Sequence, residues 1–178
     1  MLEVGRRIET PAGGWLQVTK RSPEQIVFER LLPPDTGGAD PHVHHDFEQT
    51  WECVSGVGGA MEVAGERREL VPGDRVPLGL GVAHRDPFNA GQGDVVIRGT
   101  LAPNNDFIEG YLAAWVHHLR AGTVDDQDEM PLLQIFAVID ATDGESYRAG
   151  IPIALQKASM PLMKRIARLR GYRASYDD

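Results

Sequence analysis

The chain is nearly free of cysteine, since Cys53 is the only one in 178 residues. A single thiol excludes an internal disulfide framework and is typical of a reducing compartment. Long apolar runs are also missing. The N-terminal residues lack the apolar segment of a signal peptide, and no apolar stretch approaches the length of a membrane-spanning helix. The sequence therefore predicts a soluble, cytoplasmic protein.

Basic residues are also few. The chain has 18 Lys and Arg against 26 Asp and Glu, which gives a net charge of −8 at pH 7. Nucleic acid and anionic membranes require clustered basic residues, so neither is expected as a partner. The one basic cluster, at residues 164–173, falls in an expected helix and is interpreted as a solvated face.

What the first hundred residues do contain is short apolar or alternating runs broken by Gly, Pro and Asp. This pattern is typical of an all-β barrel or sandwich. A length of 178 residues with 42% apolar content suits one domain with an appendage. The clearest strands are expected at residues 15–19, 25–31, 49–54, 60–64, 66–71 and 94–101.

The apolar period changes at Pro103 from two to between three and four residues. Helices are therefore expected near residues 104–119, 131–139 and 153–168, with Pro161 a potential interruption of the third and Gly171 its stop. The acidic stretch 125–129 is either a solvated linker or an acidic start to the second helix. We predict a β-barrel domain over residues 1–103 and a helical extension over 104–178.

The apolar positions of this extension are too numerous for a solvated appendage. The helices are expected to pack on the barrel exterior or across a dimer interface, because they would otherwise expose an aggregation-prone patch. A lid over the functional site is the alternative. The apolar positions are Tyr111, Trp115, Leu119, Leu132, Phe136, Ile139 and Leu155.

The strongest chemical signal is a run of histidines at residues 42–45. Three imidazoles lie within four residues of a chain that has six His, and His84 follows after a Gly-rich turn. Side chains alternate along a strand, so His42 and His44 project to the same side and His45 to the other. Neutral imidazoles bind first-row divalent metals. A surface His pair is the plain alternative to a metal site.

The order of these features resembles the cupin superfamily over about residues 24–102. The matching elements are the HxH pair at His42 and His44, a Gly-ended strand at Gly56, the Pro-Gly-Asp turn at 72–74, and His84. The chain departs from the cupin motifs where Gln49 occupies the acidic position, Gly79 replaces Pro, and Asn89 comes one residue late. The sequence Leu-Arg-Gly-Tyr-Arg at 169–173 is similar to the tail of a group of single-domain bacterial cupins, mostly of undefined activity.

This resemblance implies a mainly β fold, a cupin-type double-stranded β-helix (jelly-roll) barrel, followed by a C-terminal α-helical extension. It also implies one divalent metal ion, which could be Zn, Fe, Mn, Co or Ni, held by His42, His44 and His84. A homodimer is a further expectation from the family. The resemblance supplies a fold and a metal site but no substrate.

The fourth ligand is either Gln49 or Glu48, and strand parity favours Gln49. Gln49 shares one strand face with Trp51 and Cys53, the more apolar set, which should face inward. Glu48 is then a surface carboxylate, unless a bulge reverses the register. Three neutral imidazoles and an amide leave the metal charge uncompensated by protein, so the site should attract an anion.

Three hypotheses for the function follow. The first is a metal-dependent enzyme that acts on a small oxygenated organic substrate in the barrel, with isomerase, cyclase or lyase chemistry favoured over a dioxygenase. The second is a non-catalytic cupin that binds or senses a small ligand, and the third is a structural barrel. A general acid or base beside the metal would separate the first two, and the nearby candidates are Asp86, Glu48 and His45.

The remaining reactive residues have plainer interpretations. Cys53 is expected to be a buried apolar filler rather than a nucleophile. Trp51 is either a pocket wall or core packing. Arg98 and Asp86 could orient a substrate carboxylate or move a proton, but surface placement is favoured for both. His117 and His118 are adjacent in a helix, so they cannot share a face.

Overall fold

The computed structural model describes residues 3–125 and 127–173. Its strands are β1 (Arg7–Glu9), β2 (Trp15–Arg21), β3 (Ile26–Leu32), β4 (His42–His44), β5 (Glu48–Ser55), β6 (Gly59–Val63), β7 (Glu66–Leu70), β8 (Arg75–Leu78), β9 (His84–Asn89), β10 (Val95–Ala102) and β11 (Ser146–Arg148). Its helices are α1 (Asp106–Ala121), α2 (Leu132–Thr142) and α3 (Ile153–Leu169). Within the described ranges, no helix has the length and apolar character that a membrane span requires.

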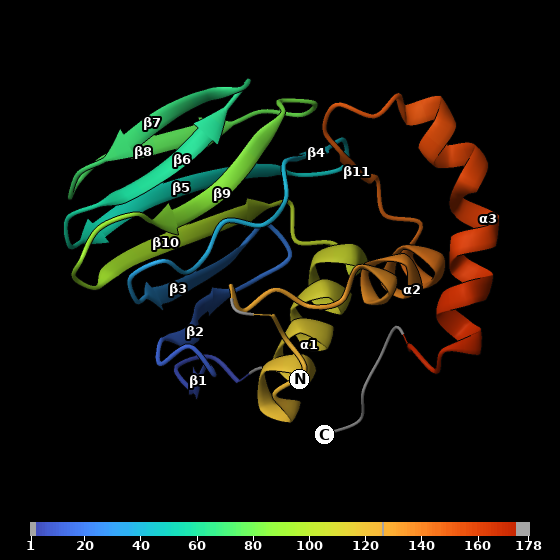
Figure 1. Ribbon diagram of the computed structural model, residues 1–178, viewed down its shortest axis with the longest axis horizontal. Coiled ribbons are helices and arrows are strands. Elements are labelled where there is room, and N and C mark those ends of the chain that lie inside the picture. The colour runs from blue at the N-terminus through green and yellow to red at the C-terminus, as the bar shows by residue number, and fades with distance from the viewer. Residues whose placement is uncertain (1–2, 126, 174–178) are drawn as a thin grey trace.

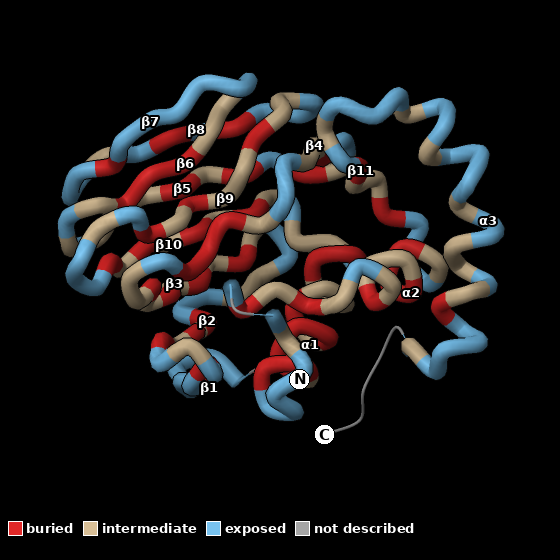
Figure 2. The backbone as a smooth tube through the Cα atoms, viewed as in Figure 1, coloured by how far each residue is buried: buried red, intermediate tan, exposed pale blue. Residues whose placement is uncertain are grey.

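The strands form two antiparallel sheets that face each other, with the helices beyond one end (Figure 1). The described residues give a six-stranded sheet in the order β1-β2-β3-β10-β5-β8 and a five-stranded sheet in the order β11-β4-β9-β6-β7. Buried residues line the space between the sheets, while β7 and α3 are mostly exposed (Figure 2). This is the cupin-like β-sandwich with C-terminal helices that the sequence predicts.

A glycine in β10 sets the packing of the largest core residue. Gly99 pairs with Phe28 on one side and Trp51 on the other. A Cβ at Gly99 would lie 2.6 Å from Phe28 Cζ and 2.8 Å from Trp51 Cζ3. The missing side chain leaves room for the Phe28 and Trp51 rings to meet edge to face, 5.5 Å apart at 89°. Trp51 is held in this way beneath the histidine cluster.

The extension contributes a strand as well as helices. Strand β11 pairs antiparallel with the histidine strand β4, so that Ser146 lies opposite His44 and Arg148 opposite His42. Neither β11 nor β1 was expected from the sequence, because a three-residue strand is too short to show a period of two. The second sheet is therefore completed by residues that lie about a hundred positions further along the chain.

Helix α1 begins and ends where its capping residues indicate. The Asn105 side chain accepts a hydrogen bond of 2.9 Å from the Ile108 N–H, and Gly122 closes the helix in the left-handed conformation. Helix α3 continues through Pro161, so the potential interruption is not observed. Gly171, at φ +84°, follows its end as expected.

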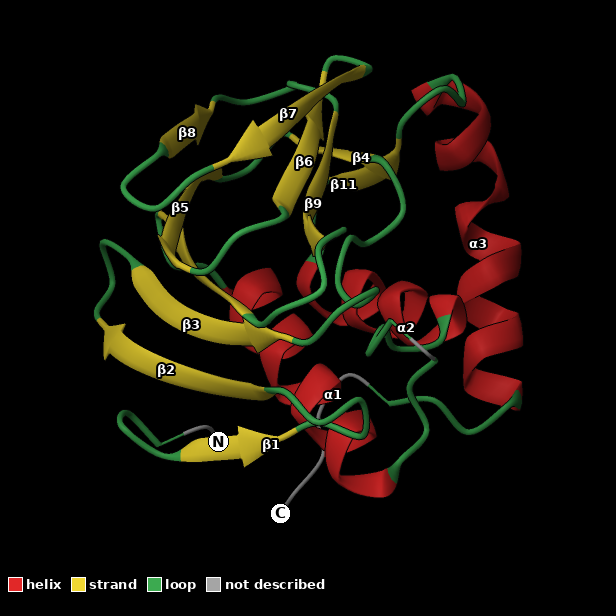
Figure 3. Ribbon diagram, turned by 60° about the vertical axis from the view of Figure 1, so that its left-hand side comes forward, coloured by secondary structure: helices red, strands yellow, loops and turns green. Residues whose placement is uncertain are grey.

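The helices pack in series from the barrel outward. Helix α1 contacts strand β1, and α2 contacts both α1 and α3 (Figure 3). Trp115 and Leu119 of α1 and Ile139 of α2 are buried, which confirms that the extension has an apolar packing face. Leu132 and Leu155 are instead 46% and 61% exposed. The amphipathic pattern therefore predicts the inner residues of α1 better than those of α3.

Candidate metal centre

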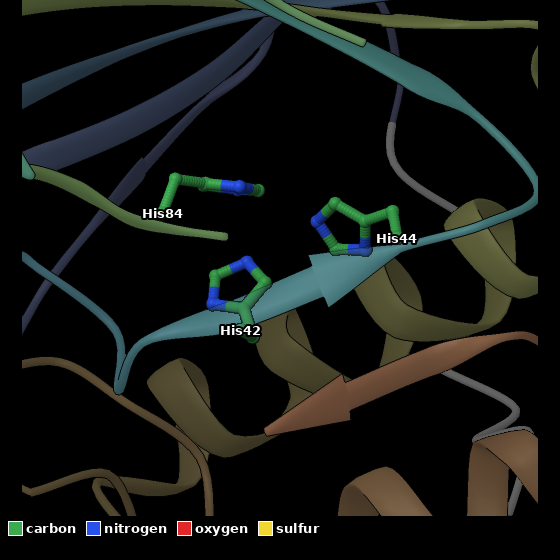
Figure 4. A group of neighbouring side chains, drawn as sticks. All are labelled: His42, His44 and His84. Atoms are coloured by element: carbon green, nitrogen blue, oxygen red, sulfur yellow. The ribbon is translucent and has the colours of Figure 1, made fainter. Parts of the chain in front are cut away.

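The three predicted histidines converge. His42 and His44 lie on β4, and His84 begins the neighbouring strand β9, where it pairs with His42. The candidate ligand nitrogens of the three rings all lie within 4.8 Å of one another. Figure 4 shows each ring turned toward one common space. The period of two places His42 and His44 together, and the pairing of β4 with β9 adds His84.

Hydrogen bonds to backbone carbonyls orient two of the rings. His42 Nδ1 lies 2.7 Å from the Asp40 carbonyl oxygen, and His84 Nδ1 lies 2.9 Å from the Val82 carbonyl oxygen. A carbonyl oxygen only accepts, so each Nδ1 carries the proton and donates it. Each Nε2 is then left with a free lone pair, which is the arrangement found in metal-ligating histidines.

The surroundings of His84 fit a cation. Its Nε2 lies 2.9 Å from Gln49 Oε1. With the proton on Nδ1, these two atoms are both acceptors and repel each other unless a cation lies between them. His44 gives a second indication of a bound cation, because its Nδ1 is buried without a hydrogen-bond partner.

Burial favours the neutral form of His44 and of His84, as metal ligation requires. Desolvation lowers the pKa of His44 well below its ordinary value, and the neighbouring His42 and His84 lower it further. Desolvation also lowers the pKa of His84, while the carboxylate of Asp86 partly opposes this shift. The donor set therefore fits a first-row divalent metal ion.

These shifts predict the pH dependence of metal binding. A lowered pKa keeps His44 and His84 unprotonated at pH values where an ordinary histidine would be half charged. Metal affinity is therefore expected to depend little on imidazole protonation down to about pH 6, and to fall below it as protons compete for the ring nitrogens. Chelator competition titrations at pH 8, 7, 6 and 5 would measure this. A steep loss between pH 8 and 7 would contradict the prediction.

Gln49 lies beside the cluster and Glu48 does not. Along β5, Gln49, Trp51 and Cys53 are buried while Glu48 is exposed, so the parity argument places these side chains correctly. Besides facing His84, Gln49 donates through Nε2 to Asp86 Oδ1 at 3.4 Å. Gln49 as a metal ligand remains a prediction.

Asp86 is the one acidic side chain that the described part of the chain brings to the histidines, and its favoured surface placement is wrong. Its Oδ1 lies 3.6 Å from His84 Nε2 and 3.9 Å from His42 Nε2. Trp51 Nε1 donates to the same oxygen at 3.2 Å. A sequence signal existed, because residues 84 and 86 share one face of a strand. Trp51 is thus both a core residue and a wall of the site.

The other candidates lie elsewhere. His45 is exposed, and Arg98 is on the outer face of β10, where it forms ion pairs with Glu29 and Glu52. Cys53 is fully buried, and desolvation followed by the charge of Asp74 raises its pKa, so it is an inert filler. His118 is buried and bonded to Thr123 and Gln134 in the helical extension.

A cavity of about 580 Å³ opens in front of the histidines, and the extension supplies much of its wall. The barrel contributes Phe28, Trp51 and Asp86. Several further lining residues are ones that sequence reasoning did not assign to a site. These are Arg30 from β3 and Tyr111, Trp115, Glu129, Ile135 and Phe136 from the extension.

The acidic stretch before α2 is therefore only partly a solvated linker. Asp128 is 2% exposed, and Glu129 lines the cavity. Asp125 is exposed, and Asp126 lies outside the described residues. A loop has no regular alternation of side chains, so no sequence pattern could have shown that Asp128 and Glu129 turn inward while Asp125 stays exposed.

Comparisons with known proteins agree with this architecture. No family model matches the sequence, and no curated protein matches it. Among solved structures, KdgF from Halomonas sp. has a TM-score of 0.50 and 19% identity, covering 60% of this chain and 97% of that one. An RmlC-like cupin from Shewanella frigidimarina has a TM-score of 0.48 and 17% identity, covering 58% and 90%.

A sugar phosphate isomerase of the cupin superfamily from Silicibacter pomeroyi is also similar, with a TM-score of 0.46 and 14% identity, over 52% of this chain and 60% of that one. At these identities the likeness concerns the fold alone. The similarity to KdgF, at a TM-score of 0.50, agrees with the two facing antiparallel sheets of a cupin-like β-sandwich.

Proposed function

We propose that this protein is a metal-dependent cupin enzyme that acts on a small oxygenated organic substrate within the cavity. The observation that carries the proposal is the convergence of three imidazoles beside the carboxylate of Asp86, at the wall of a cavity. A structural barrel has no need of a buried histidine cluster with an acidic neighbour.

We assign a role in metal binding or proton transfer to each side chain of the site. His42, His44 and His84 would hold the ion, and Gln49 is proposed as a fourth, uncharged ligand. A bound divalent ion, Zn, Fe, Mn, Co or Ni, would act as a Lewis acid and lower the pKa of an oxygen that it binds. Asp86, fixed by its hydrogen bond from Trp51, is placed to accept a proton from a substrate beside the histidines.

The walls of the cavity favour chemistry away from bulk water. Aromatic and aliphatic side chains of α1 and α2 cover the side opposite the barrel, which would strengthen the electrostatic effect of the ion and of Asp86. An uncharged ligand set stabilises a higher oxidation state poorly. Isomerase, cyclase or lyase chemistry is therefore preferred to a dioxygenase reaction.

The test is the metal content of the protein purified without a His tag and reconstituted with each of the five metals. One ion per chain is expected, measured by elemental analysis. A content well below one ion per chain with every metal would refute the proposal. The alternative, a non-catalytic cupin that binds or senses a small ligand, would be favoured if the metal-loaded protein binds small oxygenated acids and returns them unchanged.

The position of the extension also bears on function. We propose that α1 and α2 act as a lid over the metal centre, because their residues form the cavity wall that faces the histidines. The division at residues 103 and 104 is then a change in structure rather than a boundary between independent units, since β11 completes the sheet that carries His42. The homodimer remains a prediction, and a molar-mass measurement in solution would check it.

A further inference from the structure

Arg30 is a buried charge on the cavity wall. It lies on β3, on the same inward face as Phe28, and is only 4% exposed. Its Cζ lies 4.3 Å from the centre of the Trp115 ring of α1, so a cation–π contact holds the guanidinium between barrel and helix. Arg30 is also one of the residues that line the cavity.

This guanidinium forms no direct ion pair with any described residue. Its Nε and Nη2 atoms are buried and have no hydrogen-bond partner, and no carboxylate in the described part of the chain forms an ion pair with it. Arg98, on the neighbouring strand, shows the usual arrangement: it is partly exposed and pairs with Glu29 at 2.7 Å and Glu52 at 3.1 Å. On these two neighbouring strands, the outward arginine therefore has two ion pairs, whereas the inward arginine has none with the described residues.

An unpaired buried arginine calls for an anion. Arginine cannot escape the cost by losing its proton, because its pKa is too high. Water could satisfy the N–H groups but would not neutralise the charge. Replacing such a residue by an apolar one of similar size is often neutral or stabilising, so the position is costly for the fold by itself.

The acidic groups around the cavity do not supply the missing charge in full. Glu129 lines the same cavity, and desolvation raises its pKa to about 7 even though Arg30 opposes that shift. Glu129 is therefore partly protonated near neutral pH. Asp86, another acid of the cavity wall, lies at the histidines, with its Oδ1 3.6 Å from His84 Nε2. Neither acid forms an ion pair with Arg30, so the guanidinium is free to bind the anion of a ligand.

We propose that the natural ligand of this cavity is a small organic acid whose carboxylate binds at Arg30 and whose apolar or aromatic body lies against Trp115 and the walls of α1 and α2. The cavity volume of about 580 Å³ lies within the range of small-molecule sites. A second oxygen of the acid would face the histidines, and for that contact alone the inference rests on the proposed function.

The test uses 2-naphthoate and its uncharged counterpart 2-naphthamide, titrated into the full-length, metal-free protein by calorimetry. The wild-type protein is expected to bind the acid at least about tenfold more tightly than the amide, because the acid forms charge-assisted hydrogen bonds with a desolvated guanidinium. Arg30→Gln and Arg30→Met should remove this preference. Arg98→Gln, a change at a paired arginine on the adjacent strand, should retain it.

Working without metal separates this inference from the metal hypothesis, since a carboxylate can also bind a metal ion. A protein that binds no metal but prefers the acid would refute only the proposed function. Equal affinity for the two probes, a preference that persists in Arg30→Gln, or no binding of the acid would each overturn the inference.

Folding of the variants is checked by thermal unfolding. Arg30→Met is expected to unfold at the same temperature as wild type or higher, because it removes an unpaired buried charge. If neither Arg30 variant folds, a crystal structure of the wild-type complex with 2-naphthoate decides. The carboxylate is expected within hydrogen-bond distance of the Arg30 guanidinium, and a carboxylate bound elsewhere would refute the inference.

Discussion

His84→Ala is expected to abolish stoichiometric metal binding. The variant removes one of three converging imidazoles, and the two that remain lie on a single short strand, so the ion would lose the ligand that joins β4 to β9. Removing even an outer-shell partner of a metal ligand costs about 10–100-fold in affinity, so the loss of a direct ligand should exceed about 100-fold. Elemental analysis after dialysis, and titration against a chelator of known affinity, would measure the effect.

His45→Ala is the matched control. His45 is in the same histidine run but is exposed, and its ring lies beside Gly81 and Tyr147 rather than in the cluster. Its removal should leave metal content unchanged. The assignment fails if His84→Ala retains as much metal as wild type, or if both variants lose it equally while remaining folded by circular dichroism.

Gln49→Glu should tighten metal binding. The change places an anionic oxygen where an amide oxygen now lies 2.9 Å from His84 Nε2. Three neutral imidazoles do not offset the charge of a divalent ion, whereas a carboxylate ligand does. We expect affinity to rise by about tenfold or more, which corresponds to about 1.4 kcal/mol. The same chelator titrations would measure the gain.

The substitution should also make the fold more dependent on metal. A glutamate at position 49 cannot donate to Asp86 as Gln49 does, and two neighbouring carboxylates repel each other unless a cation lies near. The rise in unfolding temperature on adding metal should therefore be larger in Gln49→Glu than in wild type. Glu48→Gln, at the adjacent exposed position, should change neither quantity. Unchanged affinity in Gln49→Glu would refute Gln49 as a ligand.

The sequence by itself determined those features that depend on local periodicity. A period of two along a strand decides which side chains share a face, so the pairing of His42 with His44 and the inward position of Gln49 follow from the order of residues alone. The same rule would have placed Asp86 beside His84. Capping residues and the change of period at Pro103 likewise located α1, because these signals arise between residues close together in the chain.

The tertiary structure alone decided which distant segments meet. No local pattern in Ser146 to Arg148 indicates that it pairs with β4, or that Glu129 turns inward from an acidic loop. The most informative case is Arg30. The alternation of β3 shows from the sequence that Arg30 faces inward, but a buried arginine usually forms an ion pair with a carboxylate. Whether such a pair forms depends on the residues that pack against the strand, because burial and charge compensation are properties of the assembled structure. Here α1 places Trp115 against the guanidinium, and the guanidinium faces a cavity without forming an ion pair with any residue that the structure describes.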